Sequence, residues 1–485
     1  MILGIAILFS FLNLFHVFYY LSKVPPNTIF IGITHWYEDY FFYLSQMTQG
    51  AMGQWSLINK YSLENIPIGF NWVFNLLLGK LSNSPVWTTY DITIFILTFI
   101  YILLMYKVLT SLFTNKIKAY SALIVALTST NWFFNPVTYF YAYTSALNRL
   151  GGVAHHVAQN ILSLVSVYLF AKLLESYKLK TAIIIALTLS ILFLMSSFYV
   201  MINIIVFVVS AVLLKNRKIV KSFLIIIAPL AVLAYFQSQV ISHPFWVLVR
   251  EWEQTRSPAT FSTFIISGGL IMFLVPFGLT KFLKIKSPLR VVGLMFAILP
   301  IVLYFSGIAG IPVFRLLQPA GYVFLAAIAT EALAGKKRIF LLLVSIYVLL
   351  QIPGLGMEIK SRVNEYYLNS HLNFLDRDVY DGLLFLKDQP HDKNVLAVHT
   401  LESFVPVVSG HSVFEGHATL TLDYKEKIDK TIAFYTNKMS EIDAYTLLKN
   451  NNIDYILWEK RFGEAPRYSF FRLLYENPKL VIFTL

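Results

Sequence analysis

Long apolar stretches recur from the first residue to about residue 353 and are separated by short polar segments. Eleven of them are long enough, some only marginally, to be helices that cross a bilayer, which takes roughly 20 mainly apolar residues. They lie at 2–22, 86–106, 119–134, 157–174, 181–197, 199–214, 219–241, 263–280, 289–306, 313–334 and 338–353. The pattern therefore predicts a polytopic α-helical membrane protein with about 11 spans.

The stretch at 181–214 is apolar throughout and fits either two short spans or one long tilted span. The basic residues of the loops favour two. With eleven spans, 17 of the 24 Lys and Arg residues before residue 354 fall in loops on one side of the membrane. Positive charge marks the cytoplasmic side of short loops. The N-terminus is therefore predicted to be cytoplasmic, and the chain from residue 354 onward extracytoplasmic.

Two polar regions are predicted on the outer side. Residues 23–85 form a first loop, in which 36–50 and 69–81 are expected to be helices lying in the membrane interface. Residues 354–485 are expected to form a small extracytoplasmic α/β domain. Its strands are predicted at 394–399, 453–458 and 480–484, and its amphipathic helices at 425–438 and 441–450. The chain would thus consist of a transmembrane domain, 1–353, that includes the first loop, and a C-terminal domain, 354–485.

The composition agrees with this pattern and excludes an ordinary soluble enzyme. Of the 485 residues, 57% are hydrophobic and 13% charged, against roughly 45–50% and about 25% in soluble domains. The first 21 residues lack the basic region and the cleavage site of a signal peptide, so we expect them to remain as the first span. The sequence therefore predicts a multi-pass protein of the plasma membrane, in contact with the lipid bilayer.

The net charge of +13 would suggest a nucleic-acid partner in a soluble protein. Here residues 1–353 hold 24 basic and 8 acidic residues, whereas residues 354–485 hold 15 and 18. The excess belongs to the loops that orient the spans, so no nucleic acid is expected as a partner. The chain contains no cysteine, which excludes thiol chemistry, and no Walker, Rossmann or nucleophile-elbow motif, so soluble-nucleotide chemistry has no support.

An acidic pair, Glu38 and Asp39, stands at the start of the first predicted helix of the first loop. If the helix begins there, Asp39 shares one face with Tyr43, Gln46 and Gly50. A carboxylate at the membrane surface among aromatic residues suits a general base. The alternative is a charge at a helix N-terminus that complements the helix dipole. The residues alone leave both interpretations open.

Arg149, His155 and His156 form a second candidate group, just before and at the start of the fourth predicted span. Adjacent histidines point in different directions on a helix, so one metal bound by both is not expected. Hydrogen bonding to a phosphate or a sugar suits these side chains better. The alternative is that the pair of histidines consists of interfacial polar residues without a ligand.

Arg315 lies at the outer end of the tenth predicted span. An arginine at that depth is costly unless it is paired or serves a ligand, and its guanidinium matches a phosphate with two hydrogen bonds. Snorkelling to the interface is the competing explanation. Arg250 and Arg256 also fit a phosphate or a sugar, although the acidic residues between them favour a self-paired surface turn.

His411, Glu415 and His417 lie close together in the C-terminal part and invite comparison with a metal site. Their spacing matches no strong zinc pattern. A glycine-rich turn of an α/β domain is the favoured interpretation, with His417 kept as a candidate for binding substrate.

Together these features resemble the GT-C superfamily of membrane glycosyltransferases. The likeness rests on 38–44 and 49–55 in the first loop, on Arg149 with His155 and His156, on Phe314 and Arg315, and on 406–423. The resemblance implies a polyprenyl-phosphate-linked sugar donor, an acceptor that is a glycan, a lipid or a protein, and transfer of hexosyl type with inversion. It also implies that Asp39 or Glu38 is the base and that Arg315 is a candidate for the carrier phosphate. A divalent metal, Mg or Mn, is a further candidate cofactor, since carboxylates of the first loop suit it as well as a proton.

Two other functions stay open at this stage. One is a transporter or a non-catalytic binder of lipid-linked glycans, and the other is a ligase or polymerase of such glycans. Transporters commonly show two related halves, and the sequence shows no such repeat. The long first loop and the C-terminal part favour chemistry at the membrane surface.

Overall fold

The computed structural model describes residues 1–32, 37–131, 143, 145–255, 260–285, 287–306, 315–368, 370–398 and 400–485. These residues divide into two compact units. The helical unit comprises residues 1–15 and 92–363, and the loop–tail unit comprises residues 16–91 and 364–485. The sequence groups the first loop with the spans, whereas the structure groups it with the C-terminal part of the chain.

The helical unit consists of helices, most of which coincide with the apolar stretches. They are α1 (Ile2–Asn13), most of α5 (Val86–Leu112), α6 (Lys116–Thr128), α8 (Ala146–Leu150), α9 (Ala154–Ser176), α10 (Leu179–Phe193), α11 (Ser197–Leu213), η3 (Arg217–Ile219), α12 (Val220–Ile241), α13 (Pro244–Gln254), α14 (Phe261–Ser267), α15 (Leu270–Leu283), α16 (Pro288–Phe305), η5 (Pro319–Gly321), α17 (Tyr322–Ala332) and most of α18 (Lys337–Leu368). Each of the eleven predicted stretches contains helix.

Length and apolarity identify five described helices that are able to cross a membrane: α5, α9, α12 with its preceding turn, α16 and α18. Two bent pairs raise the number to seven if each pair is one span: α1 with α2 (Phe15–Leu21), and α14 with α15. A helical, multi-pass membrane protein is therefore supported, whereas the number of 11 spans stays a prediction.

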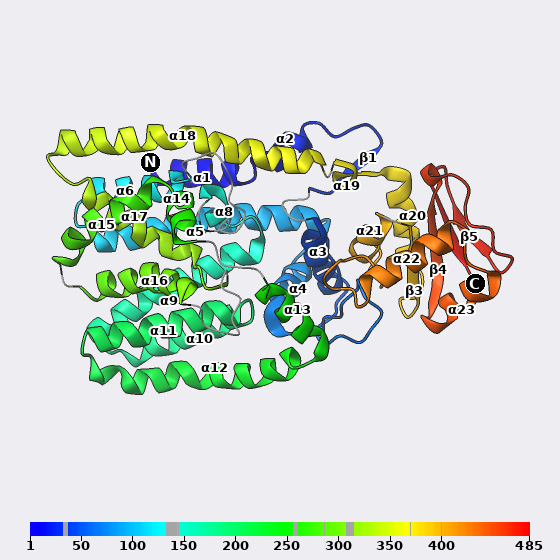
Figure 1. Ribbon diagram of the computed structural model, residues 1–485, viewed down its shortest axis with the longest axis horizontal. Helices are drawn as coiled ribbons and strands as arrows, with labels where there is room; N and C mark the ends of the chain where they lie inside the picture. The colour runs from blue at the N-terminus through cyan, green and yellow to red at the C-terminus, as the bar shows by residue number, and fades with distance from the viewer. Residues whose placement is uncertain are drawn as a thin grey trace. The chain divides into compact units, whose positions relative to one another are not determined.

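The apolar stretch at 181–214 forms two helices, as the loop charges favoured. α10 ends at Phe193 and α11 begins at Ser197. The Ser196 hydroxyl accepts a hydrogen bond from the backbone N–H of Tyr199, so a serine side chain caps the second helix. α10 packs against both α9 and α12, and Figure 1 shows these helices side by side.

The loop–tail unit contains all the described strands. Its elements are α2, β1 (Thr28–Phe30), α3 (Tyr37–Ala51), η1 (Phe70–Trp72), α4 (Val73–Lys80), α19 (Ser370–Asn373), β2 (Phe374–Asp376), α20 (Arg377–Lys387), β3 (Asn394–Ala397), α21 (Leu401–Val408), α22 (Tyr424–Tyr435), α23 (Glu441–Asn450), β4 (Ile453–Glu459), η6 (Lys460–Phe462), β5 (Arg472–Glu476) and β6 (Leu480–Thr484). The main sheet has the order β3-β4-β6-β5, with β3 parallel to β4 and the other pairs antiparallel. β1 and β2 join the first loop to the C-terminal part as an antiparallel pair.

α3 carries the acidic pair, and its surroundings differ from the prediction of a helix in the membrane interface. Every residue from 40 to 50 is buried, and the helix packs against α4 and α21. Phe41, for example, lies edge-on to Phe404 of α21 with 4.9 Å between ring centroids. An interfacial helix buries only one face in lipid, so α3 is a core helix of the loop–tail unit and the interfacial prediction is wrong.

Candidate active site

The acidic pair occupies the first turn of α3. Carboxylates are favoured there because they complement the positive end of the helix dipole. The two side chains differ in exposure: the Asp39 side chain is 43% exposed and that of Glu38 is 28% exposed. Asp39 is therefore the more accessible of the two carboxylates.

His417, from the C-terminal part, lies against both carboxylates. Its Nδ1 is 3.7 Å from Oε2 of Glu38, and its Nε2 is 3.5 Å from Oδ1 of Asp39. The imidazole is 3% exposed and lies edge-on to the rings of Phe42 and Tyr61, at centroid distances of 5.9 and 6.3 Å. The structure thus brings together three of the residues that the sequence selected.

The hydrogen bonds of His417 indicate which ring nitrogen carries the proton. Nδ1 accepts from the backbone N–H of Thr419 at 3.2 Å, and the Thr419 hydroxyl lies 3.3 Å from the same atom. A nitrogen that accepts a backbone N–H carries no proton, so the neutral ring is protonated at Nε2. Nε2–H is the group that faces Asp39.

Glu38 is held by its neighbours more tightly than Asp39. Its Oε2 accepts from the backbone N–H of Ala418 at 3.2 Å, and its Oε1 accepts from the Tyr37 hydroxyl at 3.1 Å. Burial, together with the charge and the hydrogen bond of Glu38, raises the pKa of Tyr37 to about 12, so the phenol stays a donor. Glu38 therefore tethers the segment after His417 to the start of α3.

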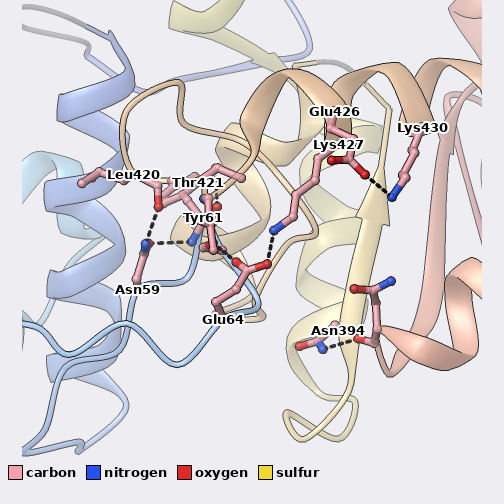
Figure 2. A network of polar contacts seen from close by, with 12 residues as sticks. Asn59, Tyr61, Glu64, Asn394, Leu420, Thr421, Glu426, Lys427 and Lys430 are labelled. Carbon is pink, nitrogen blue, oxygen red and sulfur yellow. Dashed lines mark hydrogen bonds and ion pairs between the residues drawn. The ribbon is translucent and has the colours of Figure 1, made fainter. Parts of the chain in front are cut away.

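A network of polar contacts holds the His417 segment against the first loop (Figure 2). The Asn59 amide donates to the carbonyl of Leu420 at 2.7 Å, and the Thr421 hydroxyl donates to the carbonyl of Tyr61 at 2.5 Å. Lys427, at the start of α22, pairs with Glu64 of the first loop. We call residues 416–423 the tail loop. Its attachment to the first loop fixes the position of His417.

The ion pair of Lys427 and Glu64 is partly buried, with side-chain exposures of 9% and 33%. Burial alone would raise the pKa of Glu64, but the hydrogen bonds from Lys427 and Ser62 hold this pKa below its ordinary value. We expect Lys427→Met to lower the free energy of unfolding by about 1–3 kcal/mol, because it leaves the Glu64 carboxylate without its cation. The measurement is the thermal midpoint of the purified protein in detergent.

Lys430 of the same helix provides the matched control. It pairs with Glu426, four residues earlier, at 2.6 Å, but the two side chains are 45% and 64% exposed. Figure 2 shows this pair next to that of Lys427. An exposed pair of this kind contributes little, so Lys430→Met is expected to change stability by at most about 0.5 kcal/mol. Equal effects of the two substitutions would contradict the role given to Lys427.

Two buried carboxylates, Glu402 of α21 and Glu415, add negative charge near the acidic pair. Burial raises the pKa of Tyr424, and so do the charges of Glu415, Glu38 and Glu402, which lie around this phenol. Among the described residues, no three His, Asp or Glu side chains are arranged to hold a metal ion. The Mg or Mn site therefore stays a prediction.

The pattern that suggested His411 as a metal ligand has a structural explanation. His411 is fully buried, stacks on His391 with 4.3 Å between ring centroids, and lies 3.1 Å from the carbonyl of Pro390. Burial and the neighbouring His391 lower the pKa of His411 to about 4, so the ring is neutral. His411 therefore serves as packing for the sheet domain and differs from His417, whose ring faces two carboxylates.

No protein-family model matches the sequence, and no curated protein matches it. Solved structures do match. ArnT from Cupriavidus metallidurans, bound to undecaprenyl phosphate, aligns with a TM-score of 0.55 over 99% of this chain and 98% of that one, at 11% identity. The oligosaccharyltransferase of Archaeoglobus fulgidus aligns with a TM-score of 0.54 over 95% of this chain and 69% of that one, at 12% identity. The archaeal oligosaccharyltransferase AglB from the same organism, in complex with an inhibitory peptide and a dolichol-phosphate, aligns with a TM-score of 0.53 at 12% identity, with the same coverage.

The chain has the GT-C fold. This confirms, at the level of fold, the resemblance that the sequence carried. At this identity the likeness extends to the fold alone, and the roles of the candidate residues depend on their own contacts.

Arg149 is built into the GT-C scaffold of the helical unit. It is 4% exposed, and its guanidinium donates to the backbone carbonyls of Tyr143, Ala126 and Ser129. The guanidinium carbon also lies 3.7 Å from the ring centroid of Tyr322. These contacts give Arg149 a structural function, and its binding of a substrate phosphate stays a prediction.

Glu358 and Arg362 of α18 support the same region, and the sequence did not single them out. Glu358 accepts from the Ser145 hydroxyl at 2.8 Å and from two backbone N–H groups at the start of α8, at 2.9 and 3.0 Å. Arg362 donates to Asn13 and to Asn148. Their only signal in the sequence is a spacing of four residues, which places both on one helical face.

The helical unit also contains four other candidates for substrate binding: His155, His156, Arg250 and Arg315. The rings of His155 and His156 lie edge-on at 4.5 Å, and Arg315 interacts electrostatically with His155. Arg315 is paired with Glu253 of α13 at 2.5 Å, so a phosphate would have to compete with this carboxylate. Arg250 is exposed on α13, and Arg256 lies outside the described residues. Binding of substrate by these five residues stays a prediction.

Proposed function

We propose that the protein is a membrane glycosyltransferase that moves a sugar from a polyprenyl-phosphate-linked donor to an acceptor hydroxyl, with Asp39 as the general base. The observation that carries the proposal is the half-exposed carboxylate of Asp39 at the start of α3, backed by the buried ring of His417. The GT-C fold supports it, because the matching structures of ArnT and AglB contain undecaprenyl phosphate and dolichol-phosphate.

Asp39 fits the base better than Glu38 does. Both oxygens of Glu38 already accept a hydrogen bond, from Ala418 and Tyr37. Asp39 has one oxygen near His417 and a more exposed side chain. A base has to present a lone pair within hydrogen-bond distance of the proton that it removes. Asp39 meets that requirement without the loss of a structural contact.

The reaction that follows is a single displacement. Asp39 takes the proton of the acceptor hydroxyl as the acceptor oxygen forms a bond to the anomeric carbon of the donor sugar. The bond from this carbon to the phosphate oxygen breaks, and polyprenyl phosphate leaves with the electron pair. Attack from the side opposite the leaving group inverts the anomeric configuration. We propose that the transferred sugar is a hexose and that the acceptor is a glycan, a lipid or a protein.

A cation near the leaving phosphate would stabilise the charge that develops on it. Arg315 is our candidate, because a guanidinium matches two phosphate oxygens. We also propose that the loop–tail unit works on the extracytoplasmic side of the plasma membrane. The support is the segregation of basic residues into one set of loops between the helices.

Transfer of a whole glycan is the second candidate. It is favoured by the match to the archaeal oligosaccharyltransferase, whose TM-score is similar to that of ArnT. Both reactions need a base on the acceptor and a lipid-phosphate leaving group. The acceptor and the size of the transferred group distinguish them.

The test follows label from donor to product in membranes that contain the protein. Donors are a radiolabelled polyprenyl-phosphate hexose, a labelled pool of longer lipid-linked glycans, and a labelled nucleotide sugar. We expect transfer from one of the lipid-linked donors with release of polyprenyl phosphate. Transfer from the nucleotide sugar in membranes depleted of polyprenyl phosphate would contradict the proposal. So would the absence of any label transfer from both lipid-linked donors.

A further inference from the structure

We propose that His417 is a positioning residue for Asp39, so that the tail loop completes the active site built on α3. The inference rests on the proposed function, since it concerns the carboxylate that acts as the base. His417 is separated from Asp39 by most of the chain, and nothing in the local pattern of either segment requires the two to meet. Their proximity is a product of the fold.

The single ring N–H of neutral His417 lies on the side of Asp39. Thr419 occupies Nδ1, at 3.2 Å from its backbone N–H, so the ring proton lies on Nε2. Nε2 is 3.5 Å from Oδ1 of Asp39. At this distance Nε2–H makes no hydrogen bond among the described residues, and Asp39 needs only a small approach to accept from it. Such a bond would restrict the rotamers of Asp39, with one oxygen toward His417 and the other available for an acceptor hydroxyl.

Three features keep the imidazole from turning away. The rings of Phe42 and Tyr61 contact it edge-on. The backbone N–H of His417 donates to the Thr421 hydroxyl at 3.2 Å, and its carbonyl accepts from the backbone N–H of Thr421 at 2.9 Å. The preceding residue is Gly416, where a Cβ would stand 2.9 Å from a ring carbon of Tyr61 and 3.1 Å from Cγ of Glu402. Only glycine lets the tail loop approach so closely.

The imidazole of His417 lies among carboxylates. Glu38 and Asp39 face it from α3, and Glu402 of α21 contacts the adjacent Gly416. Since Nδ1 already accepts from the backbone N–H of Thr419, Nε2–H is the ring donor that remains for Asp39.

Two substitutions separate positioning from packing. His417→Phe keeps a ring and removes the donor, whereas His417→Gln keeps an N–H donor on a shorter side chain. With a polyprenyl-phosphate hexose as donor, we expect His417→Phe to lower kcat about 100-fold with little change in KM, because a misplaced catalytic group costs about this much. His417→Gln should recover at least about 10-fold of the loss in kcat.

His411→Gln is the control for the loss of a buried histidine. It removes a ring from the same part of the chain, and its described contacts are with His391, Ser409, Pro390 and Tyr455. We expect its kcat and KM to match wild type once the thermal midpoint shows that it is folded. Equal losses of kcat in His417→Phe and His417→Gln would reduce His417 to a packing residue and overturn the proposal.

Asp39→Asn in the same assay distinguishes a failure of the positioning function of His417 from a failure of the proposed base. If Asp39→Asn is inactive and His417→Phe retains full kcat, the positioning function is wrong and the proposed base stands. If Asp39→Asn retains activity, the proposed base is wrong, whatever the His417 variants show.

Discussion

Asp39→Asn is expected to abolish sugar transfer while the protein stays folded. Asparagine has the same shape as aspartate but has no basic oxygen that can take the acceptor proton. The loss of a general base costs typically 10²–10⁴-fold in rate. Because the Asp39 side chain is 43% exposed, the substitution should change stability by no more than about 0.5 kcal/mol. The rate of label transfer from the lipid-linked donor, compared at equal amounts of folded protein, measures the effect.

Glu38→Gln is the matched control for this experiment. A glutamine carbonyl still accepts one of the hydrogen bonds that Glu38 makes with Ala418 and Tyr37. We expect a loss of about 10-fold or less, since the substitution disturbs the attachment of the tail loop and leaves the base in place. An inactive Glu38→Gln together with an active Asp39→Asn would exchange the roles of the two carboxylates. Full activity in both variants would remove the acidic pair from the mechanism.

Gly79→Val is expected to produce the second large effect, through the packing of α3 against α4. A Cβ at Gly79 would stand 1.9 Å from the carbonyl oxygen of Met47, and a Cβ at Gly50 would stand 2.1 Å from that of Leu76. The obstacle in both cases is backbone, which cannot rotate away. Overpacking of a core costs typically 1–3 kcal/mol, and the helices would have to separate.

The displacement of α3 should also reduce activity, because α3 carries Asp39. A shift of the base by about 1 Å costs about 100-fold in rate. The measurements are the yield and thermal midpoint of the purified variant, and the rate of label transfer by its folded fraction. Gly356→Ala of α18 is the control: a Cβ there meets nothing within 4 Å, and alanine in a helix is slightly favoured over glycine. A Gly79→Val protein with wild-type stability and rate would contradict the close packing of the two helices.

Several elements were predictable because their signals are local. The predicted strands near 394, 453 and 480 correspond to β3, β4 and β6, and the two predicted amphipathic helices correspond to α22 and α23. Alternation and helical periodicity are properties of short windows. β5, by contrast, is an edge strand whose Arg472 and Leu473 are both exposed, so it has no alternating pattern to read. α21 contains Pro406, and proline inside a helix is unfavourable, so the sequence gives no signal for this helix. In the structure the helix forms, and all of its residues are buried.

The surroundings of α3 were not predictable because the elements that cover this helix lie far from it in the sequence. Its aromatic residues fit equally well against lipid and against protein, since both are apolar. The structure places α4 and α21 around the helix, and this depends on contacts such as that of Thr48 with the carbonyl of Val407, more than 350 residues apart. Composition shows that the aromatic surface of α3 has to be covered, but it does not show whether lipid or protein covers it.

Local residue order thus already fixes the apolar helices, the basic loops and the acidic pair at a helix start, because hydropathy, charge and capping act within a few residues. The meeting of Asp39 with His417 has another origin. It requires the first loop and the C-terminal part to fold as one unit, with Asn59, Glu64 and Lys427 holding the tail loop in place. Contacts between residues that are so far apart in the sequence depend on how whole elements pack. Packing in turn depends on shape and burial over the entire unit. The candidate base can therefore be read from the chain, but the histidine that faces it emerges only when the chain is folded.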